Sequence, residues 1–341
     1  MEAAAKARRM SAILPQVSIG LPTYNRPELL SRVLDGFRNQ TFGDFELIIS
    51  DNASPNPEVK QLCERYAAQD ARFRYVRQPV NQGAERNFWF VYDQARAPLF
   101  LWASDDDLWP ADFLERGVGA LKANPWASAW FCQVVNIDAS GDIVRVYPSF
   151  KRFQSSWLKS TDLVRFLWEP ELMGKANLIY SIFRRQTLAK IVDIFRGRPA
   201  TWGTDMNLVY GHLCRFDLLV DDQVVLQKRV TAGIADLVAH PRSQIYPRQE
   251  RAIYFENYRR AAAGSGYWLF TAAVLVARSA YDYWASGRAA RDYDEWELRR
   301  DFENWRKETR RDFEHWRTVQ WARVLRVLGR IRARLLSRAS R

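Results

Sequence analysis

The sequence predicts an α/β fold, in which a mixed, mainly parallel sheet is flanked by helices and followed by a C-terminal helical extension. Two observations lead to this prediction. Short β-branched runs alternate with segments of helical period over residues 17–135, and the chain from about residue 250 onward has a helical pattern. With 341 residues, 48% of them hydrophobic, the chain is long enough for one large domain with an appendage.

Five short apolar segments are expected to be strands: residues 17–21, 46–50, 74–77, 99–103 and 129–135. The segments between them carry apolar residues three and four positions apart, and several open with proline, which suits the first turn of a helix. The expected helices are residues 26–40, 57–69, 84–95 and 110–124. Strands that are joined through helices pair in parallel by right-handed crossovers.

The chain beyond the alternating region changes in character. Residues 136–230 are less regular, because glycine, proline and aromatic residues interrupt the periodic segments, and they could supply a second ligand site. We expect an N-terminal tail at 1–14, a domain at 15–245 with halves at 15–135 and 136–245, and a helical C-terminal region at 246–341.

The formal net charge of +12 is concentrated at the C-terminal end. Residues 317–341 contain eight arginines and no acidic residue. Such a segment favours binding to an anionic membrane surface. The α/β half has no regular interleaving of basic and aromatic residues, which argues against nucleic acid as a partner.

Two further C-terminal features bear on the membrane. The apolar segment 261–277 is only about 17 residues long and contains glycines, whereas a spanning helix needs about 20, so a buried or interfacial helix is favoured. Related aromatic motifs end at Trp296, Trp305 and Trp316. The last two are eleven residues apart, a spacing that places them on the same face of a long helix. That helix could pack on the domain, lie on a membrane, or pair two copies of the chain.

The compartment is predicted from the cysteines and the N-terminus. Cys63, Cys132 and Cys214 are widely spaced and odd in number, which predicts buried thiols in a reducing compartment. Residues 1–15 lead into a short strand-like run rather than a sustained apolar stretch, so no secretion is expected. We expect a cytoplasmic protein, with the basic end holding it at the inner face of the cell membrane.

Three adjacent carboxylates, Asp105, Asp106 and Asp107, follow the apolar segment 99–103 just before an expected helix. Ligands of open α/β sheets bind beyond the carboxyl ends of the strands, and clustered carboxylates suit Mg2+ or Mn2+ holding a phosphate. The alternative is a helix cap, but a cap needs one acid, and three adjacent acids repel one another. The triplet therefore predicts a divalent metal site.

Polar residues follow the first two strands and are expected at the same sheet edge. Thr23, Asn25 and Asp51 can hydrogen-bond a base or ribose, although each alone also fits an ordinary turn or cap. The loop 81–87, with amides, Gly83 and an arginine, suits phosphate or ribose contact or a plain turn.

Four motifs in this order carry a resemblance. They are Pro22-Thr-Tyr-Asn-Arg26, Glu46-Leu-Ile-Ile-Ser-Asp-Asn-Ala-Ser54, Asn81-Gln-Gly83 with Asn87, and Ser104-Asp-Asp-Asp107 before Pro110. Over roughly residues 15–135 the chain resembles the family 2 glycosyltransferases of GT-A fold. The resemblance implies an inverting transfer of a sugar from a nucleotide diphosphate, helped by a divalent metal.

The resemblance also implies roles for single residues. Asp51 would contact the base, Asp105 and Asp106 would contact ribose and metal, and Asp107 is an additional candidate ligand. The implied nucleotide-binding residues are Pro22, Thr23, Tyr24, Asn25, Asp51, Asn52, Asn81, Gly83, Asn87 and Asp105.

Asp205 resembles the family's catalytic base, in Trp202-Gly-Thr-Asp205-Met-Asn at the start of an expected helix over residues 205–213. Its alternative role is to stabilise that helix through the dipole. Glu169 and Glu171 are weaker candidates for the base. The other candidates are His212 as a ligand or a structural residue, Trp102 and Trp109 as sugar platforms or core residues, and Lys228, Arg229, His240 and Arg242 as a basic loop over the diphosphate.

The predicted function is a glycosyltransferase that moves a sugar from a UDP, GDP or dTDP donor to a hydroxyl of a glycan or lipid-linked acceptor, in surface polysaccharide or glycoconjugate synthesis. The donor half would use Mg2+ or Mn2+, and residues 317–341 would contact the membrane. The alternative is a non-catalytic scaffold of the same fold with a membrane- or nucleic-acid-binding tail. A dinucleotide-binding oxidoreductase is excluded because only Gly20 stands where a Gly-x-Gly-x-x-Gly turn is needed.

Overall fold

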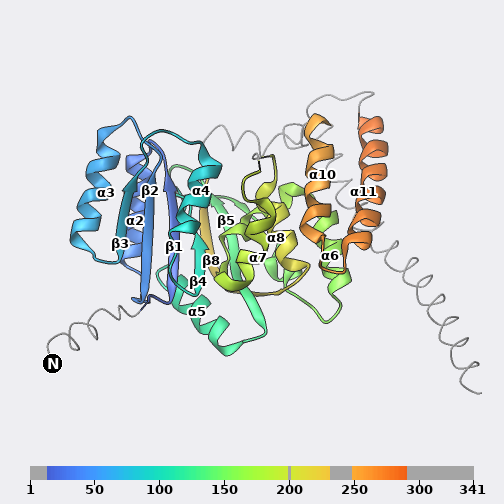
Figure 1. Ribbon diagram of the computed structural model, residues 1–341, viewed down its shortest axis with the longest axis horizontal. Coiled ribbons are helices and arrows are strands. Elements are labelled where there is room, and N and C mark those ends of the chain that lie inside the picture. The colour runs from blue at the N-terminus through green and yellow to red at the C-terminus, as the bar shows by residue number, and fades with distance from the viewer. Residues whose placement is uncertain (1–13, 199–200, 231–247, 290–341) are drawn as a thin grey trace, which may run out of the picture. The chain divides into compact units, whose positions relative to one another are not determined.

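The computed structural model describes residues 14–198, 201–230 and 248–289 (Figure 1). By their contacts the described residues up to 280 form one compact unit, and residues 281–289 belong to a second. The expected domain boundary after residue 245 lies outside the described residues and stays a prediction. The aromatic motifs at 293–316 and the basic end at 317–341 lie outside the described residues, so the expectations for them stay predictions.

Within the described residues, one sheet contains eight strands in the order β3-β2-β1-β4-β7-β5-β6, with β8 paired to β5. The strands are β1 (Val17–Thr23), β2 (Phe45–Asp51), β3 (Phe73–Arg77), β4 (Leu99–Trp102), β5 (Ala127–Ile137), β6 (Ile143–Val146), β7 (Ile182–Arg184) and β8 (Asp217–Arg229). Strands β1, β2, β3 and β4 pair in parallel, as do β5 and β8, whereas β6 and β7 are antiparallel to their neighbours. The predicted mixed, mainly parallel sheet is confirmed.

The five predicted strands and four predicted helices are all present. The helices are α2 (Pro27–Arg38), α3 (Pro57–Gln69), α4 (Ala84–Asp93), α5 (Phe113–Ala123), α6 (Lys159–Trp168), α7 (Arg185–Phe195), α8 (Thr204–Leu213), α10 (Arg248–Ala262) and α11 (Trp268–Ala289), with short 3-10 turns η1 (Phe150–Phe153), η2 (Glu171–Met173) and η3 (Lys175–Tyr180). Proline occupies the first turn of α2 and α3, where its missing N–H costs nothing.

The apolar segment 261–277 is two helix ends rather than one helix. Helix α10 stops at Ala262 and α11 starts at Trp268. Between them Gly264 and Gly266 have φ of +75° and +83°, a backbone region that favours glycine and ends the helix. The expectation of a single buried or interfacial helix was therefore wrong. In the part of the chain that the structure describes, no helix has the length and apolarity needed to cross a membrane.

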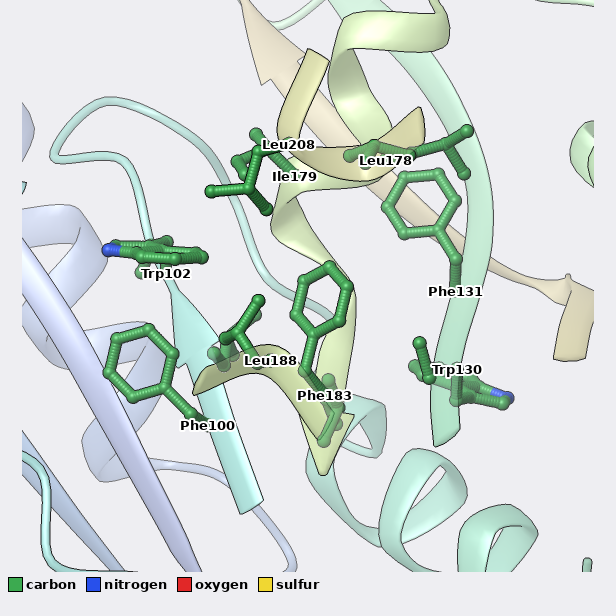
Figure 2. Close-up of a cluster of buried hydrophobic side chains, with 14 of the residues drawn as sticks. Phe100, Trp102, Trp130, Phe131, Leu178, Ile179, Phe183, Leu188 and Leu208 are labelled. Carbon is green, nitrogen blue, oxygen red and sulfur yellow. The ribbon is translucent and has the colours of Figure 1, made fainter. Parts of the chain in front are cut away.

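The core joins the strand before the acidic triplet to the helix that carries Asp205. Figure 2 shows side chains of β4, β5, η3, α7 and α8 gathered around Phe183 of β7. Trp102 of β4 lies 6.4 Å from Phe183, centroid to centroid. Leu208 of α8 is buried in the same cluster, three residues after Asp205. Since close-packed interiors have low compressibility, this core fixes β4 and α8 relative to one another.

The packing of α5 on the sheet allows a matched test of this core. A methyl carbon added at Gly117 would lie 2.5 Å from Ile182 Cδ1 and 2.7 Å from Trp130 Cε3, whereas nothing lies within 4 Å of the same position at Gly119. We expect Gly117→Ala to lower the free energy of unfolding by about 1–3 kcal/mol. Gly119→Ala, in the same helix, should raise it by up to about 1 kcal/mol. Urea denaturation measures both, and equal effects would contradict the packing described.

Candidate functional site

Two strand ends meet at the acidic triplet. The hydroxyl of Thr23, the last residue of β1, donates to Asp105 Oδ2 at 2.8 Å, and the Tyr24 backbone N–H approaches the same oxygen at 3.4 Å. Asp105 follows β4, and β1 and β4 are parallel neighbours, so their carboxyl ends lie together. Thr23 and Asp105 are buried, whereas Tyr24 is 43% exposed. The first expected nucleotide loop and the acids therefore share one edge of the sheet.

Asp105 and Asp106 form a pair that already holds one cation, the guanidinium of Arg26. Arg26 Nη1 lies 3.4 Å from Asp105 Oδ1 and 2.8 Å from Asp106 Oδ2. Burial raises the pKa of Asp105, and the neighbouring carboxylate of Asp106 adds to that effect. The Arg26 side chain is 48% exposed, so it can move away at little cost. Two adjacent carboxylates that require positive charge fit a divalent metal.

Asp107 does not belong to this pair. It is fully buried, its Oδ1 accepts the backbone N–H of Arg229 at 3.1 Å, and its Oδ2 lies 3.9 Å from Lys228 Nζ. Burial raises the pKa of Asp107 to about 7, against the attraction of Lys228. Among the described residues, no three potential metal ligands come together. The structure thus directs Asp107 toward β8, whereas the sequence had placed it with the other two acids.

Asp51 at the end of β2 is fully buried and already bonded within the protein. Its Oδ1 accepts the Ser54 backbone N–H at 2.8 Å, and its Oδ2 accepts from Arg77 Nη1 at 2.6 Å and from the Tyr75 hydroxyl at 3.1 Å. Asp51 and Arg77 are register partners on β2 and β3. Asp51, Tyr75 and Arg77 therefore form one hydrogen-bonded group at the ends of β2 and β3.

The loop before α4 is tied to the end of β2 by amide side chains. Asn52 Nδ2 donates to Asn81 Oδ1 at 2.9 Å and to the Gly83 carbonyl at 3.1 Å, and Gly83 has a φ of +85°. Asn87 Nδ2 donates to the Ser50 carbonyl at 2.9 Å. Asn52 and Asn87 are buried, whereas Asn81 and Gly83 are exposed. Within this group, the exposed pair is what a ligand can reach.

The first expected loop is linked to the second in the same way. The Asn25 backbone N–H donates to Ser54 Oγ at 2.8 Å, and the Asn25 side chain accepts from the Asn56 N–H at 3.2 Å. Asn25 has a φ of +58°, which asparagine tolerates better than most residues. Pro22 lies within β1, opposite Ser50. All the expected donor-side residues except Asp107 thus gather at one end of β1, β2 and β4.

Asp205 stands at the start of α8 and faces a second group of charges. Burial raises its pKa, and Lys228 and Lys175 oppose that shift. Its Oδ1 accepts the Met206 backbone N–H at 2.7 Å, which is compatible with the helix-stabilising role as well. Lys228 Nζ lies 4.7 Å from the centre of the Tyr180 ring, and the charges of Asp106, Asp107 and Asp205 all act on Tyr180. Lys228 and Tyr180 therefore interact with both Asp106 and Asp205.

The other candidates have structural partners. Glu169 pairs with Arg152 at 3.1 Å, and Glu171 is buried in ion pairs with Arg278 and Lys175. His212 is buried, its Nε2 lies 3.2 Å from Ser128 Oγ, and burial lowers its pKa to about 3, so it is neutral near pH 7. Trp102 and Trp109 are core residues, and the cysteines Cys63, Cys132 and Cys214 are buried free thiols. The Arg229 side chain donates to the carbonyls of Asp138 and Ala139. His240 and Arg242 lie outside the described residues.

Sequence reasoning missed three contributors to this site. Arg26 was seen only as part of a motif, although it carries the charge that balances the acid pair. Arg77 could have been found, because the ends of two predicted parallel strands bring it beside Asp51. Tyr180 gave no signal, since it lies in a 3-10 turn with no readable motif.

Comparison with protein-family models places the chain in a known family. Residues 18–190 match the model described as "Glycosyl transferase family 2", which is about half of the chain. The chain therefore belongs to glycosyl transferase family 2 and is a glycosyltransferase. That membership favours the enzyme over the non-catalytic scaffold.

Individual relatives cover only part of the chain. It is 33% identical over 194 residues to the GalNAc(5)-diNAcBac-PP-undecaprenol beta-1,3-glucosyltransferase of Campylobacter jejuni, covering 55% of this chain and 58% of that protein. It is 32% identical over 112 residues to the uncharacterized protein y4gI of Sinorhizobium fredii, 33% of this chain and 12% of that protein. The chain thus spans less than two thirds of either relative.

Solved structures show the same fold. The crystal structure of S. aureus TarS 1–349 in complex with UDP-GlcNAc superimposes with a TM-score of 0.55 at 16% identity, covering 76% of this chain and 70% of that one. The shared fold is GT-A, a mixed sheet with helices on both faces.

Proposed function

We propose that this glycosyltransferase inverts the anomeric centre of a sugar that it takes from a nucleoside diphosphate and places on a hydroxyl of a glycan or a lipid-linked acceptor. The observation that carries the proposal is the gathering of Thr23, Asp105 and Asp106 at one sheet edge, with Lys228 close enough to interact with both Asp106 and Asp205. The UDP-GlcNAc complex of TarS and the undecaprenol-linked substrate in the name of the C. jejuni relative support the donor and acceptor classes.

The donor would lie along the carboxyl ends of β1, β2 and β4. Tyr24, Asn81 and Gly83 are exposed there and can contact ribose or base. Arg77, whose side chain is 37% exposed beside the buried Asp51, offers donors to the base. Lys228 supplies a cation toward the leaving diphosphate, and the attraction of Asp106, Asp107 and Tyr180 raises its pKa despite burial, so it stays protonated.

Asp105 and Asp106 would hold the divalent metal, Mg2+ or Mn2+, in place of the Arg26 guanidinium. When bound, the metal neutralises negative charge on the diphosphate. Asp205 would accept the proton of the attacking hydroxyl. The acceptor oxygen then forms its bond to C1 of the sugar while the bond from C1 to the diphosphate oxygen breaks, and the nucleoside diphosphate leaves.

The place of action is part of the same proposal. Residues 317–341 would bring the enzyme to anionic lipid at the inner face of the cell membrane, where a lipid-linked acceptor is found. The role is synthesis of a surface polysaccharide or glycoconjugate.

Calorimetric titration of UDP, GDP and dTDP, with and without Mn2+, tests the donor site. We expect one nucleotide to bind in a metal-dependent way and the double variant Asp105→Ala, Asp106→Ala to lose that binding. Asp107→Asn is the matched control, because Asp107 is directed away from the pair, and should keep the metal dependence. If no nucleotide binds the folded wild-type protein, the proposed donor site is wrong.

A further inference from the structure

The segment that carries Asp205 is held by a helix outside the family match, which ends at residue 190. Asn257 of α10 donates from Nδ2 to Thr201 Oγ1 at 2.9 Å. Asn207 Nδ2 donates to the Tyr254 carbonyl at 3.4 Å. These two bonds fix α10 to both sides of Asp205, before and after it in the chain.

The Tyr254 ring covers the turn that starts α8. Gly203 precedes the helix with a φ of +79°, and a methyl group there would overlap the Tyr254 ring. The Trp202 ring packs edge-on against Tyr254, with centroids 5.0 Å apart. The absence of a side chain at Gly203 lets an aromatic ring lie directly on the backbone two residues before Asp205. The conformation of this turn therefore depends on Tyr254.

The hydroxyl end of Tyr254 is anchored in a buried ion cluster. It donates to Glu171 Oε1 at 3.0 Å and lies 2.7 Å from the Tyr258 hydroxyl, which must then be the donor in that second bond. Glu171 also accepts two bonds from Arg278 Nη2, at 2.7 and 2.8 Å, and pairs with Lys175 Nζ at 3.1 Å. Helices α10 and α11 and the turns η2 and η3 meet in this cluster.

The cluster also carries charge that faces Asp205. Lys175, which pairs with Glu171 in this cluster, attracts the Asp205 carboxylate. Lys228 from β8, Tyr180 from η3 and Tyr258 from α10 also interact electrostatically with Asp205. A shift of α10 would change both the direction and the electrostatic environment of Asp205.

We propose that the C-terminal helices complete the catalytic machinery, with Tyr254 as the positioning residue that holds Asp205 in place. The inference rests on the proposed role of Asp205 as the base. It makes residues 248–280 necessary for catalysis, whether or not the residues that follow them bind a membrane. A misplacement of about 1 Å at a reacting group can cost about a hundredfold in rate.

The test compares Tyr254→Leu, which removes the ring, with Tyr254→Phe, which keeps the ring over Gly203 and removes the anchor. Tyr66→Phe is the matched control, because Tyr66 of α3 is also buried and its hydroxyl donates to the carboxylate of Asp35 in α2 at 2.7 Å. The assay is release of nucleoside diphosphate from a sugar nucleotide of the base that binds, with water as acceptor. We expect Tyr254→Leu to lower kcat by about ten- to a hundredfold with donor affinity unchanged, and Tyr66→Phe to leave kcat unchanged.

A double-mutant cycle separates positioning from general destabilisation. In an Asp205→Asn background, Tyr254→Leu should cause no further loss of kcat, since the group it positions is gone. If Tyr254→Leu does not fold, Tyr254→Phe is used in the same cycle, and full kcat in that variant overturns the inference. Full activity of Asp205→Asn overturns the proposed base instead. If Asp205→Asn lowers kcat but both Tyr254 variants keep the wild-type kcat, the positioning role of Tyr254 is wrong and the proposed base still stands.

Discussion

Asp205→Asn is expected to lower kcat by about 10²–10⁴-fold, the usual contribution of a general base, while the affinity for the donor nucleotide stays the same. The amide keeps the size of the side chain and an oxygen that can accept the Met206 N–H, so the start of α8 is preserved. A role limited to the helix dipole would instead cost about 0.3–1 kcal/mol of stability and leave kcat alone. Steady-state kinetics and thermal unfolding of the same variant distinguish the two roles.

Asp162 offers a matched control for this substitution. It is a buried carboxylate in the first turn of α6, where it accepts from the Ser156 backbone N–H at 2.7 Å and from its hydroxyl at 2.9 Å. Asp162→Asn should lower the unfolding temperature without changing kcat. If Asp205→Asn behaves in the same way, Asp205 is a structural acid and the base must be sought elsewhere.

The first half of the sheet could be predicted from sequence because its information is local. Strands β1 to β5 each contain a short run of strand-forming residues, and polar residues stand at or just after the ends of β1, β2 and β4, so order alone placed Thr23, Asp51 and Asp105 at one edge. The segment 57–69 matched α3 at both ends, because proline opens it and Asn56 caps it with a bond to the Glu58 N–H. Such signals do not depend on distant parts of the chain.

The direction of Asp107 could not be predicted, because it depends on β8. Leu108 pairs with Gln227 through backbone bonds of 2.8 and 3.2 Å, and this bridge turns Asp107 toward Lys228. Strand β8 gave a weak signal, since Asp221 and Asp222 interrupt its apolar run where the register with β5 shifts. Strand β7 has only three residues, too few for a readable period. Contacts that join distant segments therefore set this part of the site.

Glu171→Ala is expected to lower the free energy of unfolding by about 3–5 kcal/mol, because it leaves Arg278 and Lys175 buried without their carboxylate. Glu256→Ala is the matched control. Glu256 also pairs with two cations, Arg259 at 3.0 Å and Arg260 at 3.2 Å, but its side chain is 44% exposed. Exposed pairs contribute about 0–1 kcal/mol, so urea denaturation at neutral pH should separate the two variants clearly. Similar losses would mean that the cluster is hydrated and contributes little.

The same carboxylate should make stability depend on acid. Burial opposes the ionisation of Glu171, but Arg278 and Lys175 outweigh it and hold its pKa at about 2, below the ordinary value of 4.5. The unfolded chain therefore takes up the proton first, so the stabilisation is complete above about pH 4.5 and is lost as the pH falls toward about 2. Glu171→Gln removes this titration, and its free energy of unfolding should fall less steeply between about pH 4.5 and 3 than that of the wild type.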